Sequence, residues 1–266
     1  MVTSGQPSEP RTTGGAQPGA RFGPVARILA GCAVLFLVLQ LGATWLMGTF
    51  DPTVSALIAS AAMLGAALLV EKLLFGRGPS AALAALGFGR PAPRALLVAA
   101  VVALIMLAVF LLFTRLAGVQ VSLSGDWLWI LLGAVALNGI AEEALFRGFV
   151  FGGLRRAGLT FRRSAAISMA LFALVHLLLF LQAPFIVALL GTLVAVAAAF
   201  PMAYLFERGY NTLWAPALLH VAAHTVRWLD IPEPNYMTAV SVWLVLQLAV
   251  PFLVFAFRGY LGRVAR

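Results

Sequence analysis

The chain has 266 residues, of which 62% are hydrophobic and only 10% are charged. Soluble domains carry about 25% charged residues, so this chain cannot hide its apolar surface in a water-soluble fold and is predicted to be a polytopic membrane protein. The formal net charge is +9, but the basic residues form short clusters between apolar runs, which argues against a nucleic-acid partner and favours membrane topology as the cause.

Residues 1–22 are rich in Gly, Pro, Ser and Thr and have no apolar core of their own, which predicts a disordered cytoplasmic tail. The first apolar run begins at about Pro24 and is too long for the apolar region of a signal peptide. We interpret it as a retained span, so that residues 23–266 form a single transmembrane domain. The only cysteine, Cys32, lies in this span and is expected to behave as a small apolar residue.

With about 20 apolar residues per crossing, the sequence predicts an all-α bundle of eight membrane-spanning helices. The predicted spans are residues 24–48, 52–70, 95–114, 127–153, 164–182, 184–206, 212–229 and 237–257. If the N-terminus is cytoplasmic, 15 of the 18 Lys and Arg residues lie on the cytoplasmic side, Arg115 and Arg227 lie outside, and Arg147 lies within the membrane. This asymmetry predicts that both termini are cytoplasmic, in the cytoplasmic membrane if the source is bacterial.

Two glutamates and an arginine interrupt the fourth predicted span within residues 138–147. On insertion scales each such charge costs roughly 2.5 to 3.5 kcal/mol, so the three cost about 8 kcal/mol before any pairing. Glu143 and Arg147 are four residues apart on one helical face and are predicted to form an ion pair that ties the helix into the bundle. Glu142 is expected to point about 100° away without a local partner, which makes it the candidate functional carboxylate.

All three histidines of the chain, His176, His220 and His224, lie in predicted spans. Counted from the nearest cytoplasmic arginine of each helix, Glu142, His176 and His220 lie 13, 13 and 12 residues into the membrane. At about 1.5 Å per residue, each is roughly 18 to 20 Å from the same face, so three helices can present these groups at one level. His224 lies one turn beyond His220 on the same side and can join them.

A buried glutamate with two or three imidazoles suits several chemistries. The carboxylate can accept and return a proton, and the imidazoles can orient a water, donate to an oxyanion or bind a metal. A divalent metal such as zinc would have His176, His220, His224 and Glu142 as its candidate ligands, and a metal-free mechanism is equally compatible. The spacing of His220 and His224 is shared with zinc peptidases, but Val221 stands where that motif has its glutamate, so any general base must come from another helix.

Three motifs then support a family resemblance. Residues 142–148 (E-E-A-L-F-R-G) resemble the E-E-x-x-x-R motif of the CPBP intramembrane proteases, the group that contains the type II CAAX prenyl endopeptidases and the bacterial abortive-infection-like proteins. Residues 172–176 (F-A-L-V-H) are similar to the F-x-x-x-H motif of that group, and residues 213–216 (L-W-A-P), which lead to His220, are similar to its third motif. Together they cover about 90 residues, 138–224, in the family's order and spacing.

This resemblance implies an all-helical bundle with a protease core at about 127–229 that hydrolyses peptide bonds of membrane-anchored peptides or proteins within the lipid bilayer. It implies that Glu142 activates the attacking water with help from His176, and that His220 stabilises the tetrahedral oxyanion. Glu143, Arg147 and Phe172 are implied to support this geometry.

His224 departs from the family, which usually has Asn or Asp at this position. A neutral imidazole can still donate a hydrogen bond there, so the departure is compatible with activity. The resemblance leaves open whether a metal takes part and whether the substrate is prenylated.

Two other functions stay open at this point. One is a proton- or cation-coupled carrier in which Glu142 and the histidines form a relay. The other is a non-proteolytic scaffold that binds a partner through the same helices. The sequence has no internal repeat and no matched pair of Gly/Pro-broken helices in its two halves, which weighs against an inverted-repeat transporter.

Overall fold

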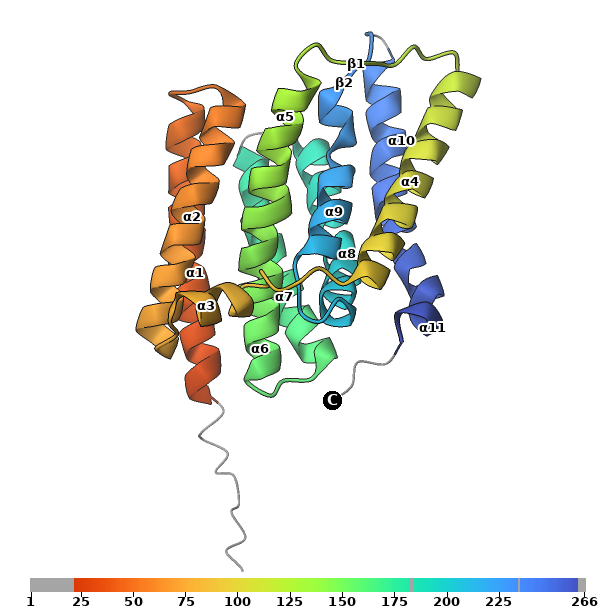
Figure 1. Ribbon diagram of the computed structural model, residues 1–266. Helices are drawn as coiled ribbons and strands as arrows, with labels where there is room; N and C mark the ends of the chain where they lie inside the picture. The colour runs from red at the N-terminus through yellow and green to blue at the C-terminus, as the bar shows by residue number, and fades with distance from the viewer. Residues whose placement is uncertain (1–21, 182–183, 234, 263–266) are drawn as a thin grey trace, which may run out of the picture.

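The computed structural model describes residues 22–181, 184–233 and 235–262, so the predicted tail lies outside the described residues except for Phe22. The described chain is a bundle of helices with a short two-stranded β-ribbon at one end (Figure 1). In chain order the elements are α1 (Phe22–Met47), α2 (Pro52–Phe75), α3 (Pro79–Ala85), α4 (Pro93–Leu116), β1 (Ser122–Leu123), α5 (Trp127–Ala134), η2 (Val135–Glu142), η3 (Ala144–Gly152), α6 (Gly153–Arg156), α7 (Phe161–His176), η4 (Leu177–Leu181), α8 (Phe185–Arg208), α9 (Trp214–Ala223), η5 (Thr225–Trp228), β2 (Leu229–Asp230), α10 (Tyr236–Ala249), η6 (Val250–Phe257) and α11 (Arg258–Leu261).

Within the described residues, seven helical stretches are long and apolar enough to cross a membrane, which confirms the predicted polytopic bundle. They are Gly23–Gly42, Pro52–Phe75, Pro93–Leu116, Trp127–Arg156, Phe161–Leu181, Phe185–Arg208 and Tyr236–Leu261. The predicted span at 212–229 is occupied by α9 and the 3-10 turn η5, which together reach from Trp214 to Trp228. α9 itself has 10 residues, fewer than the seven long stretches, and it packs inside the bundle against α4, η2 and α8.

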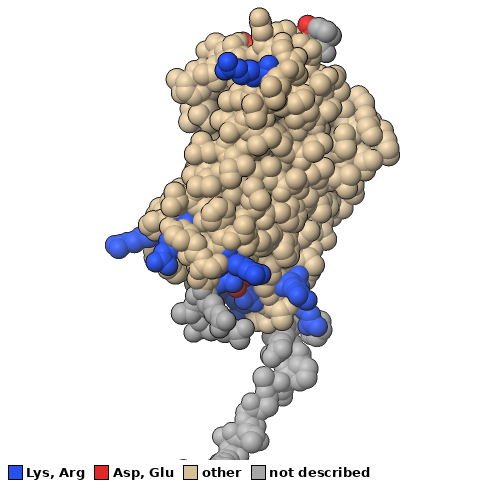
Figure 2. Space-filling model, turned by 90° about the vertical axis from the view of Figure 1, so that its right-hand side faces the viewer, with Lys and Arg blue, Asp and Glu red and all other residues tan. Residues whose placement is uncertain are grey.

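The described chain begins and ends at the same end of the bundle (Figure 1). Figure 2 shows most of the visible Lys and Arg side chains at that end and an almost uncharged surface along the middle of the molecule. Large apolar side chains of several helices, such as Leu41, Leu104 and Val245, are exposed, as lipid-facing positions require. The positive-inside rule identifies the basic end as cytoplasmic.

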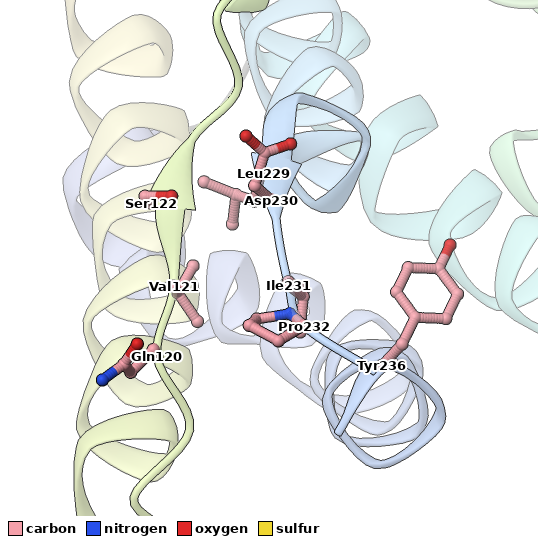
Figure 3. A pocket seen from close by; sticks show the side chains of 8 residues that line it. All are labelled: Gln120, Val121, Ser122, Leu229, Asp230, Ile231, Pro232 and Tyr236. Atoms are coloured by element: carbon pink, nitrogen blue, oxygen red, sulfur yellow. The ribbon is translucent and has the colours of Figure 1, made fainter. Parts of the chain in front are cut away.

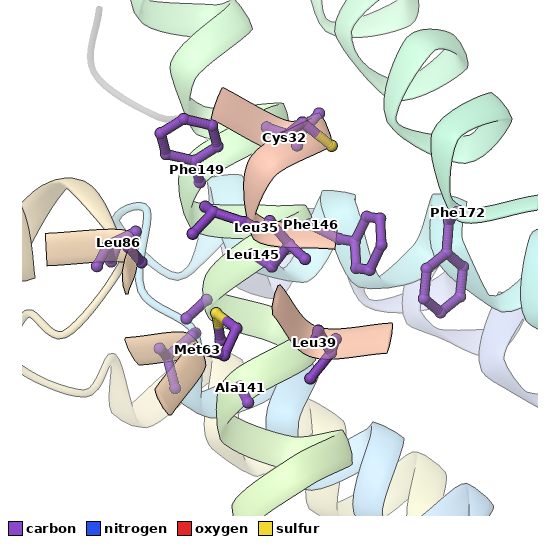
Figure 4. Packing of buried hydrophobic residues seen from close by; sticks show 14 of the residues in the cluster. Cys32, Leu35, Leu39, Met63, Leu86, Ala141, Leu145, Phe146, Phe149 and Phe172 are labelled. Carbon is purple, nitrogen blue, oxygen red and sulfur yellow. The ribbon is translucent and has the colours of Figure 1, made fainter. Parts of the chain in front are cut away.

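The main hydrophobic core surrounds the fourth span. Figure 4 shows Leu145, Phe146 and Phe149 of η3 packed among side chains of α1 and α2. Cys32 is a buried free cysteine within this cluster, in agreement with its predicted role as a small apolar residue. The catalytic candidates of the fourth span therefore stand on a helix that is packed by neighbours on most of its surface.

The chain between α3 and α4 connects two parts of the bundle, running across it from the side of α2 to the side of α4 (Figure 1). Within it, residues 86–89 touch η3, where a Cβ on Gly148 would lie 2.1 Å from the carbonyl oxygen of Leu86. Only glycine permits so close an approach of two backbones. The amide of Leu213 donates to the carbonyl of Gly87 at 3.0 Å, and the indole of Trp214 donates to Gly89 at 2.7 Å. This 86–89 segment thus joins η3 to the beginning of α9.

Candidate active site

The central part of the fourth span, η2 and η3, is π-helical. π-helical turns hold more residues than α-helical turns and are frequent at functional sites. Close packing brings η2 to α9, since a Cβ on Gly139 would lie 2.7 Å from Cγ2 of Val221. A larger residue at position 139 would push the two helices apart. The glycine therefore lets the glutamates of the fourth span reach the histidines of α9.

Glu143 is fully buried and is the centre of a charged cluster. Its Oε1 atom accepts a hydrogen bond from Nη1 of Arg147 at 2.8 Å, so the predicted ion pair is present. The same oxygen lies 2.6 Å from Nδ1 of His220, which donates because a carboxylate can only accept. Glu143 thus connects the fourth span to α9 through one carboxylate oxygen.

Arg147 has further contacts that hold its charge inside the bundle. Its Nη2 atom lies 3.2 Å from the sulfur of Met202 on α8, and its guanidinium carbon lies 4.9 Å from the centre of the Phe172 ring on α7. A cation over an aromatic face is stabilised by the ring quadrupole, most strongly where water is excluded. Four helical elements therefore meet around the pair of Glu143 and Arg147.

Glu142 has a different environment from its neighbour. Its Oε1 atom accepts a hydrogen bond from Nδ2 of Asn138 at 2.8 Å, while its Oε2 atom lies 3.8 Å from Nε2 of His220. Its side chain is 17% exposed, whereas that of Glu143 is 0% exposed. One oxygen of Glu142 is therefore held by a donor, and the other faces an imidazole on a side chain that is only partly buried.

Two expectations about Glu142 need correction. The sequence predicted that it points away from Glu143, but both carboxylates face His220, one at each ring nitrogen. The wide π-helical turn reduces the angle between adjacent residues, which an α-helical projection overstates. The sequence also predicted no local partner, whereas Asn138, four residues earlier, donates to it. The i, i+4 spacing of an amide and a carboxylate was the signal available in the sequence.

His176 ends α7 beside Phe172. Its Nδ1 atom lies 2.8 Å from the carbonyl oxygen of Phe172, and the two rings pack edge to face with centroids 4.5 Å apart. The Phe172 ring also lies edge-on to the ring of His220, at 6.3 Å between centroids. Phe172 thus separates the two imidazoles and fixes the side from which each ring approaches the site.

His224 ends α9 one turn after His220, and the two rings stack with centroids 5.4 Å apart and planes inclined by 26°. Near-parallel stacking places the ring nitrogens of the two residues in separate planes. The structure therefore brings Glu142, Glu143, Arg147, Phe172 and His220 into one contacting group, with His176 packed on Phe172 and His224 on His220.

Comparison with known proteins accords with this geometry. The family model for type II CAAX prenyl endopeptidase Rce1-like proteins matches residues 124–226. The chain carries an Rce1-like domain. That domain runs from the start of the fourth span into η5 and contains every charged and imidazole residue of the cluster. No curated protein and no solved structure matches the chain.

The match of residues 124–226 to a protease family, together with the apolar spans, indicates a multi-pass integral membrane protein. A membrane-associated substrate and a lipid environment follow at the level of the family.

The predicted zinc ligands are Glu142, His176, His220 and His224. A catalytic zinc site needs about three protein ligands that converge on one point. In the described part of the chain, no group of three or more His, Cys, Asp and Glu side chains is placed to hold a metal ion. The rings of His220 and His224 are stacked, with planes inclined by 26° and centroids 5.4 Å apart. The described residues do not fit a zinc ion in this arrangement.

A separate cavity of about 740 Å³ lies at the opposite end of the bundle from the basic surface. Figure 3 shows its lining side chains on the β-ribbon and the neighbouring loops, with Tyr236 at the start of α10. None of the lining residues belongs to the predicted site. The cavity is therefore distinct from the charged cluster of the Rce1-like domain.

Proposed function

We propose that the protein is an intramembrane endopeptidase in which Glu142 is the general base that activates a water molecule. The observation that carries this proposal is the difference between two adjacent glutamates. Glu143 is fully buried and contacts both Arg147 and His220, whereas the side chain of Glu142 is partly exposed and has one oxygen 3.8 Å from the imidazole of His220. A general base must be ionised, held in place and reachable, and Glu142 meets the last two conditions by its contacts.

In the proposed reaction, a water held by Oε2 of Glu142, with His176 assisting, loses a proton to the carboxylate as its oxygen attacks the peptide carbonyl carbon. The carbonyl oxygen becomes the oxyanion of a tetrahedral intermediate. The carbon–nitrogen bond then breaks, and the proton held by Glu142 passes to the leaving nitrogen. No step uses a metal, because the described side chains do not converge on one.

His220 is proposed to stabilise the oxyanion in its imidazolium form. Its Nδ1 atom already donates to Glu143, so only a protonated ring can also donate from Nε2. Two carboxylates flank the ring, one near each nitrogen. With Arg147 as the second cation, the two positive charges balance the two negative ones, which lowers the cost of burying the cluster. His224, stacked on His220, is proposed to be the second donor to the oxyanion.

Cleavage by purified protein tests this proposal. The protein in detergent is offered two membrane-anchored peptides, one ending in a prenylated CAAX sequence and one with an unmodified transmembrane segment, and the products are identified by mass spectrometry. We expect a defined fragment of at least one peptide from the wild type and none from Glu142→Gln. Ion flux in liposomes without cleavage would favour a carrier, and binding of a partner that survives Glu142→Gln without cleavage would favour a scaffold.

A further inference from the structure

We propose that Asn138 is a positioning residue that fixes the orientation of the Glu142 carboxylate. This inference rests on the proposed function, in which Glu142 activates the water. Asn138 is 7% exposed and lies in η2, and its Nδ2 atom donates to Oε1 of Glu142 at 2.8 Å. An ionised carboxylate accepts hydrogen bonds and cannot donate them, so the amide nitrogen is the end of Asn138 that must face it.

The orientation of a glutamate carboxylate is otherwise weakly determined. The terminal torsion of Glu is broad and roughly two-fold, so either oxygen can turn towards a substrate water. The amide of Asn138 holds Oε1, which leaves Oε2 as the oxygen that faces His220 at 3.8 Å. Oε1 is thereby held by Asn138, and Oε2 is left to contact the substrate water. Fixing the base in this way reduces the number of unproductive orientations that the reaction must otherwise exclude.

Asn138 is itself held against movement. The next residue, Gly139, packs so closely on Val221 of α9 that no Cβ fits between them, so the backbone at this point cannot shift towards α9. Losing the hydrogen bond to Glu142 would also cost free energy, because it would leave a polar amide without a partner inside an apolar bundle. An apolar residue could fill the same volume without needing a partner. The use of an amide there is explained by its donation to Glu142.

The test compares Asn138→Leu, which has nearly the same volume but no donor, with Ser168→Ala as a matched control. Ser168 is also buried near the site and donates to the carbonyl of Phe146 at 3.1 Å, but it does not touch Glu142. Both proteins are assayed for cleavage of membrane-anchored peptide and for thermal unfolding. We expect kcat to fall by up to about 10²-fold in Asn138→Leu, with KM within a factor of about 2, and to stay at the wild-type value in Ser168→Ala.

Rescue and a second variant make the assay specific. Asn138→Gln keeps an amide donor on a longer side chain and should recover part of the lost kcat, which a purely structural role would not predict. If Asn138→Leu fails to fold, Asn138→Ala adds no volume and takes the same measurements. Wild-type kcat in folded Asn138→Leu or Asn138→Ala would overturn the inference.

An infrared measurement separates this inference from the proposed function. With glutamate labelled by ¹³C, the difference between wild type and Glu142→Gln isolates the carboxylate band of Glu142. We expect this band to shift when Asn138→Leu removes the donor and to stay in place in Ser168→Ala. A wild type that cleaves no peptide defeats the proposed function, and the band then decides alone whether Asn138 holds Glu142. An unshifted band defeats the inference whatever the activity.

Discussion

Two of the arginine–glutamate pairs in the described bundle differ in burial and in the charged groups around them. At the cytoplasmic end, Arg155 of α6 pairs with Glu207 of α8 at 2.9 Å, and both side chains are partly exposed. In the middle of the fourth span, Arg147 pairs with Glu143, and both are buried. Beside the second pair stands Glu142, whose cationic contact among the described residues is His220 at 3.8 Å rather than an arginine. Pairing with arginine accounts for the burial of Glu143, and the carboxylate without an arginine partner is the one that we propose as the general base.

The largest expected effect is that of Glu142→Gln on turnover. The amide cannot accept the water proton, so kcat should fall by about 10²- to 10⁴-fold, the usual contribution of a general base. The oxygen of the new side chain can still accept from Asn138, so the thermal unfolding temperature should change little. Turnover and unfolding are measured on the same preparation. Wild-type turnover in Glu142→Gln would show that Glu142 is not the general base and that the two glutamates do not differ in this role.

Glu143→Gln should act mainly on stability. It leaves Arg147 buried without a counter-charge, and breaking such a pair on one side typically costs about 3 to 5 kcal/mol of unfolding free energy. Unfolding in detergent measures the loss. The double variant Glu143→Gln with Arg147→Met is the control, because removing both charges should recover most of that stability. If the single variant is as stable as the wild type, the buried pair is not what holds this part of the bundle.

His224→Asn should have a smaller effect. Asn is a hydrogen-bond donor like a neutral imidazole, so activity should persist within the factor of about 10² to 10³ that one oxyanion donor is worth. A chelator should leave the activity of the wild type and of the variant unchanged. Metal analysis of the purified protein completes the experiment. Stoichiometric zinc in the wild type that is lost in His224→Asn together with turnover would reverse this expectation and restore a metal site.

The smallest effect is expected at the cytoplasmic pair. Glu207→Gln breaks the contact with Arg155, but the two side chains are 31% and 20% exposed, so water screens the interaction. The loss of unfolding free energy should be less than about 1 kcal/mol, and kcat should not change. Added salt should reduce the difference in unfolding free energy between the wild type and Glu207→Gln, because salt screens this exposed pair. A loss as large as that of Glu143→Gln would show that burial does not separate the two clusters.

Hydropathy and charge placement were sufficient to predict the bundle, and helical spacing was sufficient for the pair of Glu143 and Arg147. Counting residues from the basic end also predicted that Glu142 and His220 lie at one depth, and they are 3.8 Å apart. The direction of Glu142 was predicted incorrectly, because the periodicity of an α-helix was assumed where packing produces π-helical turns. The segment at 212–229 is helical from Trp214 to Trp228, but its change from α-helix to 3-10 helix after Ala223 has no signal in an apolar stretch.

Other contacts of the site depend on tertiary structure. The sulfur of Met202 lies 55 positions from Arg147 in the sequence and meets it only because α8 packs on η3. No sequence pattern indicates which residue a methionine in an apolar helix will contact. The stacking of His224 on His220 also depends on α9 ending at His224, which spacing alone does not predict.

The 86–89 segment has a mechanical consequence for the whole molecule. Its backbone touches η3 at Gly148 and accepts hydrogen bonds from Leu213 and Trp214 at the start of α9. This short connection, which lies outside the spanning helices, therefore acts as a spacer between the helix of Glu142 and the helix of His220. The distance between η3 and α9 is thus set partly by a segment that belongs to neither helix. Inserting residues after Gly89 would lengthen this spacer and change that distance, with Glu142 and His220 both left unchanged.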